Sequence, residues 1–127
     1  MSERTVLQSM SQRHVLSLGP TASVHDAACA MTRANCGSVL IIDSAGTMQG
    51  IVTERDLMTR NPQCVGPEVK VADAVLIMIE RGFRHLPIVE AGGRVVGVFS
   101  ARDALPREVN TAVDMAEFNE RVNDALG

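Results

Sequence analysis

The hydrophobic pattern in the first half of the chain predicts one helix followed by one β-hairpin. Residues 24–34 are mostly apolar or small, and the stretch is long enough for about three helical turns. Two short apolar runs follow, one over Val39–Asp43 and one that ends at Thr53, and the turn Ser44-Ala45-Gly46 separates them. Apolar runs joined by a short loop with a glycine are typical of a hairpin. Ser23 can cap the start of the helix.

The second half predicts the same order of elements. Its helix begins near Val71 and ends at Arg81, because Gly82 suits the left-handed position that follows a helix. The hairpin runs from Leu86 to Ser100 around a second glycine-containing turn. In each half we also expect a short third strand before the helix and a short last helix; these lie at His14–Leu18 and Gln63–Val65, and after Thr53 and Ser100.

The two halves are copies of one unit at a constant offset of 47 residues. Residues 19–57 align with residues 66–104 without a gap, so that Gly19-Pro20 corresponds to Gly66-Pro67. A unit too small to bury its own apolar surface must pack against its copy. The sequence therefore predicts an α/β (α+β) fold of two β-α-β-β-α repeats, over 8–60 and 61–105, packed with pseudo-two-fold symmetry.

The helix of each repeat is apolar around most of its circumference. Val75-Leu76-Ile77-Met78-Ile79 and Ala27-Ala28-Cys29-Ala30-Met31 leave no polar stripe. A helix that is buried on one face only should carry such a stripe. We therefore expect a second surface to cover both helices, most simply the same face of another subunit, which predicts a homodimer. An isolated apolar run in a small domain is the alternative.

Residues 106–127 lie outside the repeat and predict an amphipathic C-terminal helix. Met115, Phe118, Val122 and Leu126 fall on one helical face. The pattern leaves open whether this face docks on its own chain, on a sister subunit or on another protein.

The composition of the chain argues against nucleic acid and membrane as binding partners. The 127 residues are 46% hydrophobic, and the net charge of −3 argues against nucleic acid, since phosphate binding needs clustered Lys and Arg. No run of about 18 apolar residues predicts a membrane span, and the first ten residues do not resemble a secretory signal. Cys29, Cys36 and Cys64 lack C-x-x-C spacing, which favours free thiols in a reducing cytoplasm.

One motif at the end of each hairpin suggests a binding site. Gly50-Ile51-Val52-Thr53-Glu54-Arg55-Asp56 returns as Gly97-Val98-Phe99-Ser100-Ala101-Arg102-Asp103. The motif places a hydroxyl, a carboxylate and backbone N–H groups at a helix start, which suits an anion, and a carboxylate there can accept the hydroxyls of a ribose. A hydroxyl followed three residues later by an acid is also a capping box that needs no ligand.

Taken together, these features resemble a tandem cystathionine-β-synthase (CBS) domain pair, also called a Bateman module. The resemblance covers about residues 8–105. The first copy departs from the family pattern, because Cys36-Gly37-Ser38-Val39-Leu40 stands where a Leu-Pro strand start is usual. The matching pieces are the Gly-Pro followed by Val-x-Asp-Ala, Met31 and Met78, the run Arg84-His85-Leu86-Pro87-Ile88-Val89, the hairpin turn, and the Gly-h-h-[Thr/Ser]-x-x-Asp ending, where h is hydrophobic.

The resemblance implies a non-catalytic sensor of adenosine-containing ligands such as AMP, ADP, ATP, NAD or S-adenosylmethionine. It implies two clefts, each of which combines the motif of one copy with strand residues of the other. The Asp would hold the ribose, and the hydroxyl and helix start a phosphate. Carried over by position, cleft one contains Thr53, Asp56, Cys64, Val65, Phe83, Arg84 and His85, and cleft two contains Ser100, Asp103, Ser17, Leu18, Cys36, Gly37 and Ser38.

Other chemistry has weaker support in the sequence. His14, His25 and His85 lack the spacing of a structural zinc site, so we expect no metal, and surface or capping roles for these residues. No cysteine lies at an electropositive helix start, so we expect no enzyme. Two classes remain: a nucleotide-binding regulatory module, acting on a protein partner that the sequence does not name, and a scaffold that keeps the fold without a ligand.

Overall fold

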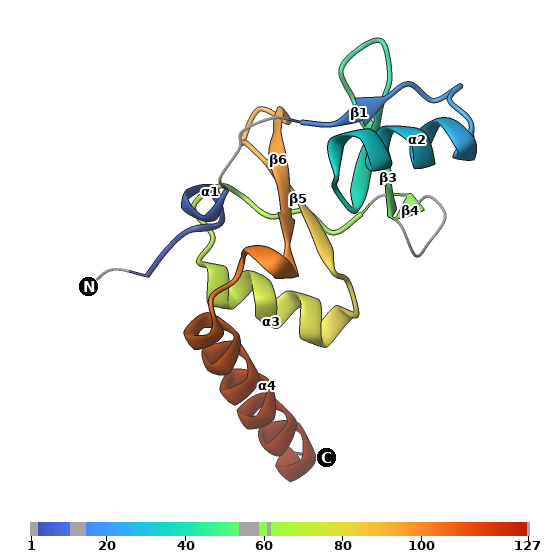
Figure 1. Cartoon of the computed structure of the whole chain (residues 1–127). Helices are drawn as coiled ribbons and strands as arrows, with labels where there is room; N and C mark the ends of the chain where they lie inside the picture. The colour runs from blue at the N-terminus through green and yellow to red at the C-terminus, as the bar shows by residue number, and fades with distance from the viewer. Residues whose placement is uncertain (1–2, 11–14, 54–58, 61, 127) are drawn as a thin grey trace.

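The structure is a computed structural model that describes residues 3–10, 15–53, 59–60 and 62–126 (Figure 1). Its elements form two hairpin-based halves and a long C-terminal helix. In chain order they are α1 (Val6–Ser9), β1 (Ser17–Leu18), α2 (Val24–Ala34), β2 (Ser38–Ile42), β3 (Met48–Thr53), β4 (Thr59–Arg60), α3 (Val71–Arg81), β5 (His85–Val89), β6 (Val95–Ser100), the 3₁₀ helix Ala101–Asp103 and α4 (Pro106–Leu126).

The first half is a four-stranded sheet in the order β1-β2-β3-β4. The predicted hairpin is the antiparallel β2–β3 pair, with Ser38 opposite Thr53 and Ile41 opposite Gly50. The predicted extra strand is confirmed as β1, which pairs in parallel with β2. Strand β4 was not predicted. It pairs with β3, and a two-residue strand is too short to give a periodic signal.

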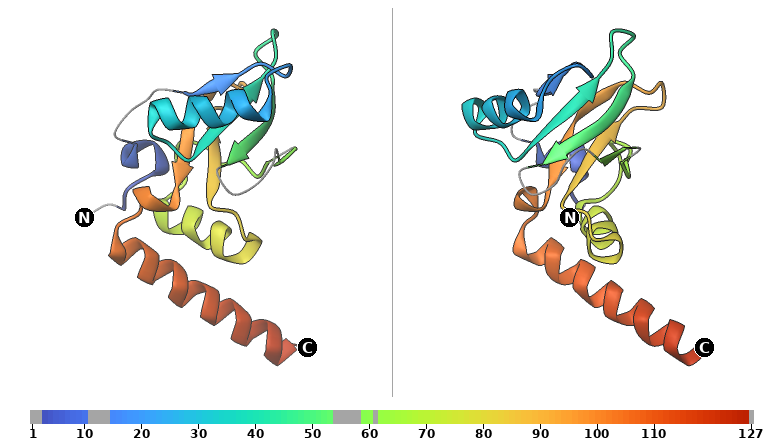
Figure 2. Two further views of the ribbon diagram at one scale, coloured as in Figure 1. Left: turned by 45° about the vertical axis from the view of Figure 1, so that its right-hand side comes forward. Right: turned by 90° about the vertical axis from the view of Figure 1, so that its right-hand side faces the viewer.

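The second half repeats the strand register of the first at the same offset of 47. His85 lies opposite Ser100 and Ile88 opposite Gly97 in the antiparallel β5–β6 pair. A parallel bridge from Val65 to Ile88 stands where β1 pairs with β2 in the first half. The offset of 47 is therefore confirmed over the paired strands of the two halves, and Figure 2 shows the two hairpins next to each other.

The C-terminal ends of α2 and α3 also follow the repeat, whereas the side-chain cap at the N-terminus is present in α2 and absent in α3. Ser23 caps α2 as predicted, since its hydroxyl accepts a hydrogen bond from the Asp26 N–H at 3.0 Å. The chain turns into the left-handed region after each helix, at Asn35 (φ 52°) and at Gly82 (φ 79°). Glycine and asparagine are the residues that adopt this conformation at low cost, which explains both positions.

A buried hydrophobic cluster is built mainly from residues of the second half. Val71, Val75 and Met78 of α3 pack with Leu86, Ile88 and Phe99 of the hairpin, and Val6 of α1 is fully buried among them. The N-terminal segment pairs with this half as well, because the Val6 N–H donates to the Val69 carbonyl at 2.8 Å and the Val71 N–H to the Arg4 carbonyl at 2.9 Å. Sequence reasoning missed α1, whose four residues carry too short a pattern.

Helix α4 docks on its own chain. It packs along α3, on the side away from the β5–β6 hairpin (Figure 2). Leu76 of α3 and Met115 and Phe118 of α4 line a groove between the two helices. For α3, then, the expected second surface is in part α4 of the same chain rather than a sister subunit alone. Within the described part of the chain, no helix is long and apolar enough to cross a membrane.

Candidate functional site

The second copy of the motif forms a strand that turns directly into a helix. Strand β6 ends at Ser100, and the 3₁₀ helix Ala101–Asp103 starts at the next residue. Asp103 Oδ2 accepts a hydrogen bond from the Ser100 N–H at 2.9 Å, and Ser100 Oγ accepts one from the Arg102 N–H at 3.4 Å. The predicted capping box is therefore present, and it holds a half-buried carboxylate at the helix start.

The motif of the second copy lies beside the start of β5, where the resemblance assigns Arg84 and His85 to cleft one and not to the motif's own cleft two. His85 is the cross-strand partner of Ser100, and such partners project from the same face of a hairpin. The Ala101 N–H donates to the Arg84 carbonyl at 3.3 Å. The Arg84 side chain is exposed and His85 is half-buried, so both have access to solvent next to Ser100.

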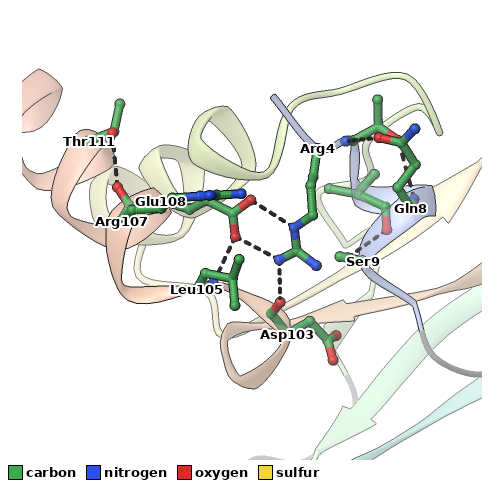
Figure 3. Close-up of polar contacts among 10 residues, drawn as sticks. Arg4, Gln8, Ser9, Asp103, Leu105, Arg107, Glu108 and Thr111 are labelled. Atoms are coloured by element: carbon green, nitrogen blue, oxygen red, sulfur yellow. Dashed lines mark hydrogen bonds and ion pairs between the residues drawn. The ribbon is translucent and has the colours of Figure 1, made fainter. Parts of the chain in front are cut away.

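A partly buried ion pair holds the end of the motif in place. The guanidinium of Arg4 donates from Nε to Glu108 Oε2 at 3.0 Å and from Nη2 to Glu108 Oε1 at 2.7 Å (Figure 3). Arg4 Nη2 also donates to the backbone carbonyl of Asp103 at 3.0 Å. Glu108 completes the network by accepting from the Leu105 N–H at 2.7 Å. The end of the motif is thus fixed to both the N-terminal segment and α4.

The electrostatics of this network follow from its hydrogen bonds. The Arg4 guanidinium holds the pKa of Glu108 below its usual value, and the Leu105 N–H acts in the same direction. The Glu108 carboxylate in turn raises the pKa of Arg4. Glu108 is only 7% exposed, so the charge it carries depends on these partners.

Several residues assigned to cleft one have a packing role. Val65 is 6% exposed and belongs to the core, and Phe83 packs against the same core. The half-buried Cys64 thiol donates to the Pro62 carbonyl at 3.3 Å, and burial raises its pKa. A thiol of this kind is a poor nucleophile at neutral pH. Asp56, the central residue of the cleft, lies outside the described residues.

The first copy brings its own residues together through the sheet. Ser38 lies opposite Thr53, and Ser17 and Leu18 pair with the middle of β2. Cys36 is exposed, and its thiol donates to the Ser38 carbonyl at 3.4 Å. These pairings link residues within one copy. The assembly of each cleft from both copies stays a prediction.

Three supporting residues were not predicted from the sequence. Arg4 and Glu108 carry no motif, since each is a single charged residue outside the repeat. Met10 is a third, because a Cβ on Gly97 would overlap Met10 Sδ and lie 3.0 Å from its Cε. The motif glycine is therefore where the N-terminal segment lies close against β6.

The groups at this site suit the binding of a ligand. The site offers a carboxylate, a hydroxyl and backbone N–H groups at a helix start, which together suit a ligand with hydroxyl and anionic groups. Among the residues that the structure describes, no group of three or more His, Cys, Asp or Glu side chains could hold a metal ion.

A comparison with protein families decides the family. The CBS domain matches twice, over residues 7–59 and 55–109. The chain belongs to the CBS domain family. The two matches cover two adjacent repeats, so the tandem arrangement is that of a CBS domain pair. A comparison with curated proteins finds no match.

Solved CBS structures share the fold. A CBS-domain-containing protein from Agrobacterium tumefaciens is 26% identical, covers 84% of this chain and 92% of its own, and has a TM-score of 0.74. The protein CBSX2, solved in complex with AMP, is 25% identical over 87% of this chain and 97% of its own, with a TM-score of 0.67. The CBS domain pair of protein MJ0100, solved with 5′-methylthioadenosine and S-adenosyl-L-methionine, is 22% identical over 80% of this chain and 93% of its own, with a TM-score of 0.74.

Proposed function

We propose that this CBS pair is a regulatory module that binds an adenosine-containing ligand in two clefts between its repeats. The observation that carries the proposal is the position of Asp103. Its half-buried carboxylate is held at the start of a 3₁₀ helix by a hydrogen bond from the Ser100 N–H. The AMP complex of CBSX2, a relative of the same fold, supports an adenine nucleotide as the ligand class.

Each side chain has a physical role in the proposed clefts. In cleft two, Asp103 accepts the two ribose hydroxyls, and Ser100 with the helix start binds a phosphate. The walls come from the first copy, at Ser17, Leu18, Cys36, Gly37 and Ser38. In cleft one, Thr53 and Asp56 act in the same way, Arg84 and His85 lie near the phosphate, and Cys64, Val65 and Phe83 form the wall.

Binding should be tested by calorimetry with AMP and 2′-deoxy-AMP. A charge-assisted hydrogen bond contributes about 1.5–3 kcal/mol, so loss of the 2′-hydroxyl should weaken binding by roughly tenfold or more. Asp103→Ala should remove one of two binding events, and Asp56→Ala the other. Equal affinity for both nucleotides, unchanged in both variants, would mean that the aspartates serve only as helix caps.

The chain offers a matched control for the capping role. Ser23 and Asp26 form the same box at the start of α2, with hydrogen bonds of 2.9 and 3.0 Å, but outside the proposed clefts. Asp26→Ala should therefore lower stability as a lost cap does, by about 1 kcal/mol, and leave AMP affinity unchanged. A fall in affinity of similar size in both variants would indicate a general loss of structure.

The proposed module does not turn its ligand over. Hydrolysis would need an activated nucleophile or a metal-bound water. Burial raises the pKa of the Cys64 thiol, which makes it a poorer nucleophile. Purified protein incubated with ATP or NAD should leave the nucleotide intact, and steady hydrolysis that one cleft substitution abolishes would overturn this.

The second candidate function is a ligand-free scaffold, which the departure of the first copy at Cys36-Gly37-Ser38 favours. Thermal shift with a panel of adenine nucleotides separates the two functions. A ligand present at about a hundred times its Kd stabilises the fold by roughly 2.7 kcal/mol, whereas a scaffold shows no shift.

We also propose a homodimer through α2, since Ala27 is the one α2 residue buried within the chain and Val24 is 64% exposed.

A further inference from the structure

Helix α2 presents a sulfur and an imidazole nitrogen in contact on its exposed side. Cys29 Sγ lies 3.5 Å from His25 Nε2. The two residues are four positions apart, so they occupy adjacent turns on one face of the helix. His25 is exposed and Cys29 is half-buried, so an ion can reach both donor atoms from solvent.

The spacing of these two atoms matches one edge of a zinc coordination tetrahedron. Zinc binds sulfur at about 2.3 Å and imidazole nitrogen at about 2.0–2.1 Å. With a tetrahedral angle at the metal, these bond lengths place the two ligand atoms about 3.5 Å apart. The observed separation therefore needs little rearrangement of either side chain, and a mixed nitrogen and sulfur pair is a donor set that zinc favours.

One chain supplies only half of a closed site. No third His, Cys, Asp or Glu joins this pair to form a metal-binding group within the described part of the chain. The outer surface of α2 is open, because Val24 and Ala28 on either side of His25 are exposed. The small side chain of Ala28 allows the backbone of another helix to come close.

We propose that His25 and Cys29 chelate a zinc ion that two copies of this chain share across their α2 helices. A two-fold axis at the metal brings together two thiolates and two imidazoles, which completes a Cys₂His₂ tetrahedron. On binding, each Cys29 thiol releases its proton to solvent, and each imidazole binds through Nε2 in its neutral form. The site is separate from the nucleotide clefts and does not rest on their occupancy.

Titration of the reduced, metal-free protein with zinc or cobalt(II) tests the site. We expect one ion per two chains, and for cobalt the absorption of a tetrahedral complex with a thiolate-to-metal charge-transfer band. Sedimentation at low micromolar concentration should show at least a tenfold tighter dimer with zinc than with a chelator. One ion per chain on a monomeric protein would overturn the shared site.

Matched variants locate the metal. His25→Ala and Cys29→Ala should each weaken binding at least tenfold and remove the cobalt thiolate band. Asp26→Asn, on the same helical turn, should retain both, as should a chain with Cys36→Ser and Cys64→Ser, in which Cys29 is the one remaining thiol. Both substitution sites face solvent at least in part, and circular dichroism checks the fold. Zinc binding that survives His25→Ala and Cys29→Ala would overturn the proposal.

Discussion

Arg4 and Glu108 form a two-hydrogen-bond ion pair across 104 positions of sequence. The same guanidinium binds the Asp103 carbonyl at the end of the CBS motif. One cation therefore joins the N-terminal segment, the proposed ribose-binding residue and the first turn of α4. The end of the motif is thus held by Arg4 and Glu108, which both lie outside the two aligned segments 19–57 and 66–104.

Loss of this cation should destabilise the fold. Arg4→Met keeps much of the apolar stem but leaves the buried Glu108 carboxylate without its main partner, which costs about 1–3 kcal/mol. Urea unfolding measures the change. Arg81→Met, at an exposed position on α3, is the control and should change stability by less than about 0.5 kcal/mol. Equal effects of the two substitutions would mean that the pair contributes nothing specific.

The same pair should give the protein a defined sensitivity to acid. The folded-state pKa of Glu108 lies below its unfolded value of about 4.3. A depressed pKa contributes stability that is fully present above the unfolded pKa and is lost as the pH falls through the folded pKa. Glu108→Gln should therefore be less stable than the natural chain at pH 7, and the difference should shrink below pH of about 4. A difference that stays constant with pH would contradict this origin.

The left-handed conformation of Gly82 after α3 predicts that two substitutions at this position differ in their cost to stability. Gly82 has a φ of 79°, and a Cβ there meets nothing within 4 Å, so strain rather than a clash decides the cost. Gly82→Ala should destabilise by about 1 kcal/mol. Gly82→Asn should cost less, because Asn35 adopts the same conformation in the first repeat. Thermal unfolding of both variants tests this, and equal costs would argue against backbone strain.

The proposed homodimer is best tested on α2. Val24→Glu places a charge on an exposed residue in the first turn of α2, where the helix dipole tolerates an acid, so the monomer should keep its fold. Analytical ultracentrifugation should then show a weakened dimer. Leu76→Glu is a poorer test, because Leu76 lines the groove against α4 and its loss also disturbs the monomer. A natural chain that is monomeric at tens of micromolar would contradict the dimer.

The sequence alone determined the repeat and most of its elements. The sequence pattern predicted the hairpins, the helix ends and a short third strand in each half, because periodicity and turn residues act over a few neighbouring positions. The parallel direction of the third strand came from the structure. The capping box of Ser100 and Asp103 was equally readable, since both of its hydrogen bonds lie within four residues.

Tertiary structure alone decided where the segments outside the repeat go. The amphipathic pattern of α4 predicted that its apolar face packs against a partner surface, but it did not say whether that surface belongs to the same chain or to another. The structure shows that α4 packs on α3 of its own chain. Arg4, Glu108 and Met10 carry no local signal, because contacts between residues about a hundred positions apart depend on how the halves fold together. Helices, hairpins and caps depend on interactions between neighbouring residues, so the sequence predicts them. The contacts of Arg4, Glu108 and Met10 with the motif form only when segments distant in sequence pack together.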